Sequence, residues 1–145
     1  MATLTELRNV RLEKLEKLKN LGIDPYPARA NKNVNNSQVV DKFETLENHD
    51  VTVAGRIISI RSHKNLVFID IKDSTGKIQL YIKNDSLEKP NYKKSEFGIE
   101  EIELIDLGDF IEATGKVTKT QRGEISVEPS KLRLLVKTLR RKPSG

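Results

Sequence analysis

The sequence contains no cysteine and no tryptophan, and it has no long apolar run. Without cysteine there are no disulfides, no thiol nucleophiles and no zinc sites built on thiolates, which favours a cytoplasmic location. No segment approaches the roughly 20 apolar residues of a membrane-spanning helix, and the N-terminus lacks a signal-peptide pattern. We therefore expect a soluble protein without a membrane partner.

Sequence features that would indicate catalysis or metal binding are also missing. No two glycines lie within three residues of one another, which excludes glycine-rich phosphate loops. His49 and His63 have no other metal ligands nearby in the sequence, and no serine or histidine lies in a recognisable nucleophile motif. We expect no catalytic residue and no metal site in this chain.

Positive charge is what the chain does carry, mostly in its second part. The 145 residues have a net charge of +5; residues 1–50 hold eight basic and eight acidic side chains, and the remainder holds eighteen and thirteen. One stretch has basic side chains and no acid, and its members are Lys131, Arg133, Lys137, Arg140, Arg141 and Lys142. This pattern suggests a polyanionic partner such as RNA, while charge alone favours a solvated basic tail.

Residues 1–48 have mainly helical periodicity. A capping box at Thr3 and Glu6 and a stop at Gly22 predict a helix over 3–21. Its apolar face is formed by Leu4, Leu7, Leu15 and Leu18. Prolines after it predict a linker, and a short helix capped by Ser37 should follow. That second helix is expected to bury Val39, Val40, Phe43 and Leu46.

From residue 49 the apolar period changes to two, which predicts a barrel domain over 49–136. Strands are expected at 51–61, 66–73, 77–83, 109–119 and 124–135, with a short helix after Gly98. Gly55 lets the long first strand bend and serve both sides of a closed sheet. The sequence therefore predicts an all-β core with flanking helices: a five-stranded OB-fold Greek-key barrel preceded by an N-terminal helix, with a small sandwich as the alternative.

Strand alternation also predicts which side chains face outward. In the second strand Val67, Ile69 and Ile71 face the core, so Phe68 points to the outside. By the same rule the outward residues of the other strands are Ser59 and Arg61, then Gln79 and Tyr81, then Glu124, Ser126 and Glu128, while Ile58, Ile60, Ile125 and Val127 face inward. A tight turn over 73–76 would place Tyr81 opposite Phe68, with Gln79 diagonal to it and Arg61 across the first hairpin.

An outward aromatic residue surrounded by Arg61, Gln79 and Glu124 suits a nucleobase. Every base has a face that stacks on an aromatic ring. Uracil offers two carbonyl acceptors and one N–H donor, so arginine or glutamine can donate to the carbonyls while a carboxylate accepts from the ring nitrogen. A Phe68 covered by a loop would have no such role, since single outward apolar residues are common.

Motifs along nearly the whole chain follow one known pattern. They are RLEKLEKLKNLGIDPYP at 11–27, VAGRIISIR at 53–61, Phe68, DSTGKIQLY at 73–81, GKVTKTQRGEISV at 115–127 and LLVKTL at 134–139. In this order and spacing they resemble the N-terminal, OB-fold anticodon-binding domain of class II lysyl-tRNA synthetases. One departure is Lys64-Asn65, where the family usually has Gly-Lys in the first hairpin turn.

The resemblance implies an anticodon-binding domain that docks the uridine-rich anticodon loop of lysine tRNA. In the family, the residue matching Phe68 stacks the central uridine, and the residues matching Arg61 and Gln79 contact its edge. Glu124 matches an acidic anticodon contact. Three further residues match weaker candidates for RNA contacts, namely Arg56, Lys119 and Thr120.

The resembling enzymes continue into a larger catalytic domain whose motifs this sequence lacks. The resemblance therefore implies a fragment of a homodimeric lysine–tRNA ligase that cannot itself form lysyl-adenylate. No cofactor is expected in this chain, and ATP and Mg²⁺ would belong to the catalytic domain. Residues 137–145 are expected to form a basic exit segment toward that domain, and to supply much of the salt-dependent affinity for RNA.

Three alternatives remain open at this point. Aspartyl and asparaginyl relatives share the Arg-Phe-Gln group, because their anticodons have the same central base. A generic single-stranded nucleic-acid-binding OB module would show the same outward residues. A protein-interaction module could use the apolar face of the first helix.

Overall fold

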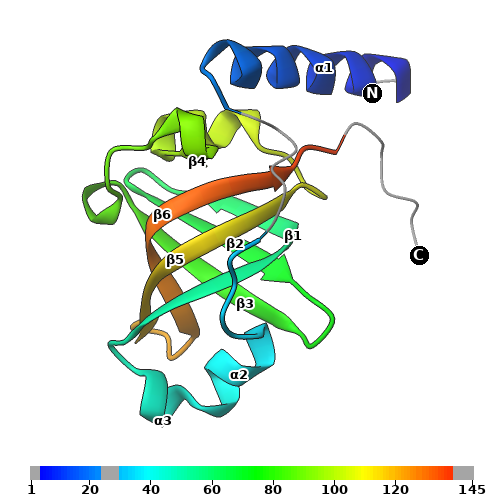
Figure 1. The fold of residues 1–145 in the computed structure, drawn as a ribbon. Coiled ribbons are helices and arrows are strands. Elements are labelled where there is room, and N and C mark those ends of the chain that lie inside the picture. Colours follow the sequence, from blue (N-terminus) through cyan, green and yellow to red (C-terminus); the bar gives the residue numbers. More distant parts are fainter. Residues whose placement is uncertain (1–3, 24–29, 139–145) are drawn as a thin grey trace.

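The computed structural model describes residues 4–23 and 30–138, and it consists of a β-barrel with helices at both ends (Figure 1). The helices are α1 (Leu4–Asn20), α2 (Asn36–Asp41) and α3 (Phe43–Leu46), with short 3₁₀ helices η1 (Asn84–Ser86), η2 (Tyr92–Lys94) and η3 (Ile99–Leu104). The strands are β1 (Asp50–Ser62), β2 (Leu66–Lys72), β3 (Lys77–Lys83), β4 (Glu96–Phe97), β5 (Phe110–Lys119) and β6 (Ile125–Val136).

The sheet closes on itself. Its strand order is β3-β2-β1-β5-β6-β4, and β3 also pairs with β6 in parallel at Gln79–Ser126 and Leu80–Val127. Closure removes the two long edges and makes a barrel rather than the sandwich considered from the sequence. The five predicted strands are confirmed, and the two-residue strand β4, which pairs with β6, is an addition. The predicted helix after Gly98 is the 3₁₀ helix η3.

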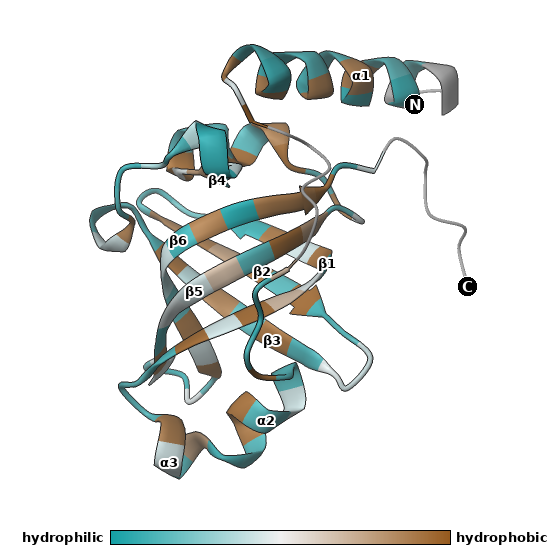
Figure 2. Cartoon of the chain, in the orientation of Figure 1, coloured by the Kyte–Doolittle hydropathy of each residue, from teal (hydrophilic) through white to brown (hydrophobic). Residues whose placement is uncertain are grey.

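The barrel interior is filled by the inward side chains of every long strand. Along the strands, hydrophobic and hydrophilic residues alternate, as Figure 2 shows. Fully buried members include Val53, Ile69, Leu80, Ile111 and Val127. This burial supplies most of the stabilising free energy of such a fold.

Gly55 is where β1 passes from one partner strand to the other. It pairs with Ile111 of β5, and the next residue pairs with both β5 and β2. A Cβ atom at Gly55 would lie 2.7 Å from the carbonyl oxygen of Lys72, so the close approach of the two strands requires glycine. The predicted role of Gly55 in the bend is thereby explained by contact distance.

A β-bulge corrects the predicted facing of Ile58. In the pairing of β1 with β2, Ile57 lies opposite Ile71 and Ser59 lies opposite Asp70, so Ile58 is an extra residue without a partner. Strict alternation placed Ile58 in the core, but its neighbour Ile57 is buried instead and Ile58 is 37% exposed. Because the bulge restores the alternation after it, Ser59 and Arg61 keep the outward facing that was predicted.

The helices agree with the sequence prediction in place but not in every detail. α1 buries Leu15 and Leu18, and its predicted cap at Thr3 and the 24–27 linker lie outside the described residues. α2 begins with Asn35 as its N-cap rather than Ser37. The side chain of Asn36 reaches instead into the β2–β3 turn, where it donates to the carbonyls of Ile71 and Gly76.

The second helix is also shorter than the predicted apolar pattern. Val39 is fully buried, but Val40 is exposed. Only one face of this helix packs on the barrel, and consecutive residues of a helix are rotated by about 100° from one another. The helical path is interrupted at Lys42 before α3 begins, which leaves Phe43 and Leu46 half-buried against the core.

Candidate nucleic-acid interface

Arg61, Phe68 and Gln79 come from three adjacent strands and lie on one outer face of the barrel. Arg61 is opposite Phe68 in the β1–β2 pairing, and Phe68 is opposite Tyr81 in the β2–β3 pairing. Gln79 is opposite Asp70, two residues further along β2. The predicted tight turn is present, since the N–H of Asp73 donates to the carbonyl of Gly76. The arrangement predicted from alternation is therefore the one that the register produces.

Hydrogen bonds hold the Arg61 guanidinium over this face. Its Nη1 donates to Asp70 Oδ2 at 2.9 Å and to Ser59 Oγ at 2.7 Å, and its Nη2 donates to Gln79 Oε1 at 2.9 Å. The hydrogen bond with Asp70, together with the charges of Asp70 and Glu124, raises the pKa of Arg61 against the opposing effect of burial. Arg61 therefore stays charged and oriented toward Gln79.

The hydrogen bonds continue from Gln79 into the β5–β6 hairpin. Gln79 Nε2 donates to Ser126 Oγ at 2.9 Å, and Ser126 Oγ donates to the backbone carbonyl of Glu124 at 3.2 Å. Ser126 was predicted to lie outside, but it is fully buried, because β3 pairs with β6 at this point and Gln79 covers its hydroxyl. Glu124 is exposed in the loop just before β6. The loop thereby places Glu124 at the rim of the group.

Phe68 is half-buried rather than open on all sides. Tyr81 lies with its ring centroid 5.3 Å away at a 42° tilt, and His63 lies 5.6 Å away in an edge arrangement. The Arg61 guanidinium carbon is 5.8 Å from the Phe68 centroid. Neighbouring rings and a cation thus hold the Phe68 ring in place while part of it remains accessible.

The three weaker candidates lie in two places. Lys119 places its ammonium 4.7 Å from the Phe43 ring centroid, and Thr120 Oγ accepts the backbone N–H of Glu124. Thr120 therefore lies beside Glu124, whereas the Lys119 side chain extends toward α3. Arg56 lies in the other half of β1, where it pairs with Phe110 and Lys72, and its Nε makes no hydrogen bond within the described residues.

Sequence reasoning did not select Asp70 and Ser126, which complete the group. Asp70 is 8% exposed and lies between Arg61 and Gln79. A signal for it was present, because alternation in β2 puts Asp70 on the same side as Phe68. Alternation in the last strand likewise put Ser126 on the side of Glu124, but its burial could not be predicted, since it depends on the pairing of two strands that are distant in sequence.

The basic stretch near the end of the chain does not form a free cationic surface where it is described. Lys131 pairs with Glu88 at 3.6 Å and Arg133 with Glu112 at 3.7 Å. Lys137, predicted to begin a basic exit segment, is fully buried between Asp106 and Asp109, at 2.6 and 2.7 Å. Arg140, Arg141 and Lys142 lie outside the described residues.

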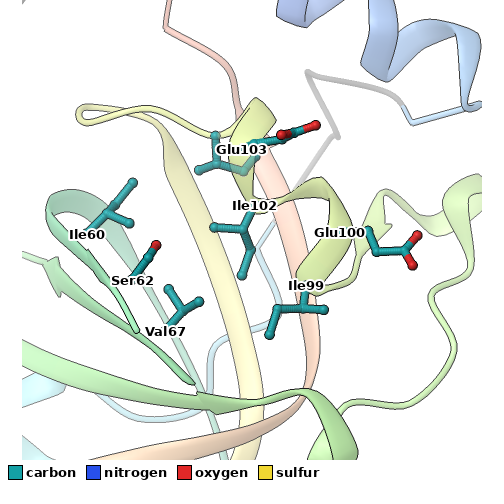
Figure 3. A pocket seen from close by; sticks show the side chains of 8 residues that line it. Ile60, Ser62, Val67, Ile99, Glu100, Ile102 and Glu103 are labelled. Carbon is teal, nitrogen blue, oxygen red and sulfur yellow. The ribbon is translucent and has the colours of Figure 1, made fainter. Parts of the chain in front are cut away.

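A separate hollow lies between the β1–β2 hairpin and η3 (Figure 3). It has a volume of about 350 Å³ and is lined by isoleucines together with Glu100 and Glu103. Ile60 lines it while the next residue, Arg61, faces the other side of β1, so the hollow and the Arg61 group are on opposite sides of the strand. Its carboxylates have the wrong charge for phosphate.

Within the described residues, no group of three or more histidine, aspartate or glutamate side chains could hold a metal ion. No helix in that part of the chain is long and apolar enough to cross a membrane.

Comparison with known proteins gives a consistent assignment. Residues 51–135 match the model of the tRNA anticodon family, described as an OB-fold nucleic acid binding domain. The chain is 41% identical to the lysine–tRNA ligase of Carboxydothermus hydrogenoformans over 97% of its length, and 40% identical to that of Moorella thermoacetica over 95%. It spans only 27% of either relative. The chain therefore belongs to the tRNA anticodon family of OB-fold nucleic acid binding domains, and nearly all of it is similar to a portion of lysine–tRNA ligases.

Proposed function

We propose that this chain docks the uridine-rich anticodon of a lysine tRNA, with the central uridine stacked on Phe68. The observation that supports this most directly is the hydrogen-bonded group of Arg61, Gln79 and Ser126 beside that ring. Stacking provides affinity for any base, and the polar side chains next to the ring provide selection among bases.

The division of roles follows from the chemistry of each side chain. Arg61 and Gln79 carry N–H groups that can donate to the carbonyl oxygens of uracil. Glu124 is exposed at the rim, where its carboxylate can accept from a base N–H. Thr120 lies beside it and the Lys119 ammonium lies next to α3, and both can contact the RNA backbone, which positions the loop without reading sequence.

The activity of the complete enzyme is part of this proposal. The similarity to a portion of lysine–tRNA ligases supports a parent protein that joins lysine to tRNA in an ATP-dependent reaction. We propose that ATP and Mg²⁺ act in the part of that parent outside this chain. Its homodimeric state and its cytoplasmic location remain predictions.

Replacing Phe68 tests the stacking role. Phe68→Ala should weaken binding of a labelled stem-loop carrying uridine at every anticodon position by about 1–3 kcal/mol. The matched control is Phe110→Ala, since Phe110 is 41% exposed at the start of β5 and outside the group. Fluorescence titration at one salt concentration measures both. Equal binding by Phe68→Ala and the parent chain would refute the stacking role.

A second candidate, a generic single-stranded nucleic-acid binder, is supported by the exposed part of the Phe68 ring alone. It predicts equal affinity when the central uridine of the stem-loop is replaced. Aspartate and asparagine stem-loops, which share that uridine, would separate a lysine-specific domain from an aspartyl or asparaginyl type.

A further inference from the structure

The hydrogen bonds across the candidate site form a chain with one direction. Arg61 Nη2 donates to Gln79 Oε1, Gln79 Nε2 donates to Ser126 Oγ, and the Ser126 hydroxyl donates to the carbonyl of Glu124. The chain begins at a guanidinium, which has donors only, and it ends at a backbone carbonyl, which accepts only. Neither end can reverse its role.

This fixed direction determines the orientation of the Gln79 amide. If the amide rotated by half a turn, its NH₂ group would face the donors of Arg61, and its oxygen would face Ser126, whose hydrogen is already given to Glu124. The hydrogen bond with Arg61 would be lost, and the Ser126 hydroxyl could donate to the amide oxygen only by giving up the carbonyl of Glu124. Ser126 is fully buried, so its hydroxyl would have no water to replace the lost donor.

Asp70 holds Arg61 in place at the start of this chain of hydrogen bonds. It is 8% exposed and accepts from both terminal nitrogens of Arg61, at 2.9 and 3.5 Å. A buried carboxylate holding a guanidinium through both nitrogens limits rotation of the arginine fork. The donor that faces Gln79 Oε1 is thereby fixed.

We propose that Ser126 and Asp70 are positioning residues that set the amide of Gln79 so that the site accepts uridine and rejects cytidine. This inference rests on the proposed anticodon function. Uracil and cytosine have the same shape, but the carbonyl acceptor at position 4 of uracil is an amino donor in cytosine, and the ring nitrogen next to it changes from donor to acceptor. Rotating the amide would adapt the site to cytosine, and the chain of hydrogen bonds opposes that rotation.

The test compares stem-loops that differ only in a central uridine or cytidine. Ser126→Ala removes the hydroxyl that fixes the amide, and it should reduce the ratio of the two affinities about fivefold, which is the value of one hydrogen bond. The control is Ser130→Ala, because Ser130 is also in β6 and its hydroxyl also donates to a backbone carbonyl, that of Thr114. The ratio of the uridine and cytidine affinities in Ser130→Ala should equal that of the parent chain.

Gln79→Glu provides a second variant of nearly the same size that does not alter Ser126. A carboxylate offers acceptors only, so this variant should shift the preference toward cytidine. Circular dichroism and thermal unfolding establish that each variant is folded. A purely structural role for Ser126 would lower both affinities together and would leave the ratio unchanged.

The outcomes separate the inference from the function on which it rests. A parent chain that prefers uridine, with a reduced ratio in Ser126→Ala and in Gln79→Glu, supports the proposal. A parent chain that prefers uridine while both variants keep its ratio overturns the positioning role and leaves the anticodon function standing. A parent chain that binds both stem-loops equally overturns both.

Discussion

At the scale of single residues, burial decides what a charged side chain does in this molecule. Lys131 and Lys137 belong to the same basic stretch of sequence, and both pair with carboxylates. Lys131 is 50% exposed and its pair with Glu88 lies in water, whereas Lys137 and Asp109 are both fully buried. An exposed pair contributes little to stability, but a buried charge that loses its partner costs several kcal/mol.

Lys137→Met should therefore destabilise the chain by about 3–5 kcal/mol, since it leaves the buried carboxylate of Asp109 without a counter-charge. Lys131→Met, the matched control, should cost less than about 1 kcal/mol. Urea denaturation followed by circular dichroism gives both free energies of unfolding. Similar midpoints for the two variants would show that Lys137 is less buried than the structure indicates.

Individual residues also show which placements could be predicted from the sequence and which could not. The outward group of Arg61, Phe68 and Gln79 was predictable, because alternation and one tight turn fix neighbours that lie close in sequence. Lys137 was predicted to begin a basic exit segment, and its burial could not be foreseen, because its partners Asp106 and Asp109 are reached only through the fold. Ile58 was wrongly placed because a bulge adds a residue that alternation cannot anticipate.

At the scale of elements, Asp73 joins the β2–β3 turn to the start of α2. One of its oxygens accepts from the N–H and hydroxyl of Thr75 and the N–H of Gly76, and the other accepts from the N–H of Asn36. Burial acts to raise the pKa of Asp73, but these hydrogen bonds outweigh it and lower the pKa. The folded chain therefore binds a proton here less readily than the unfolded chain does.

The lowered pKa of Asp73 gives a prediction for acid conditions. The contribution of Asp73 is fully present above the unfolded pKa of about 3.9 and is lost as the pH falls through the lower folded pKa. Asp73→Asn should cost about 2 kcal/mol at neutral pH, and the difference from the parent chain should shrink below about pH 4. Urea denaturation at a series of pH values measures this difference.

The control for that series is Asp41→Asn, at the exposed end of α2. Its unfolding free energy should stay within about 0.5 kcal/mol of the parent chain throughout. A difference between Asp73→Asn and the parent chain that stayed constant down to pH 2 would contradict the ionised role of Asp73. The sequence predicted the turn itself, but not that its aspartate also anchors a helix 37 residues away.

At the scale of the whole molecule, different charged side chains lie at the two ends of the barrel. The exposed carboxylates Glu100 and Glu103 lie on η3, at the end covered by α1. At the opposite end, the β5–β6 hairpin carries Lys119 next to α3 (Figure 1). A phosphate at the hairpin end would lie near the Lys119 ammonium, and this end adjoins the Arg61 group through Ser126 and Glu124.

This distribution predicts that stacking and charge contribute separately to RNA binding. Each phosphate that a cation neutralises on a single strand adds about −0.7 to the slope of log affinity against log salt concentration. Lys119→Met keeps an apolar contact with Phe43 but removes the charge, so it should make the slope shallower by about that amount. Phe68→Ala should weaken binding at every salt concentration without changing the slope, because stacking releases no counterions.

Lys94→Met is the control for charge alone, because Lys94 is exposed on η2 at the far end of the barrel. At about 0.1 M salt the Debye length is roughly 10 Å, so salt screens the Lys94 charge from RNA bound at the hairpin end. Removing that charge should change neither the affinity nor the slope. Titrations of one stem-loop at several salt concentrations measure all three variants. If Lys94→Met flattened the slope as much as Lys119→Met, the RNA would be responding to net charge rather than to a surface at the hairpin end. A difference between the two lysines would place the phosphates at the hairpin end of the barrel, next to α3.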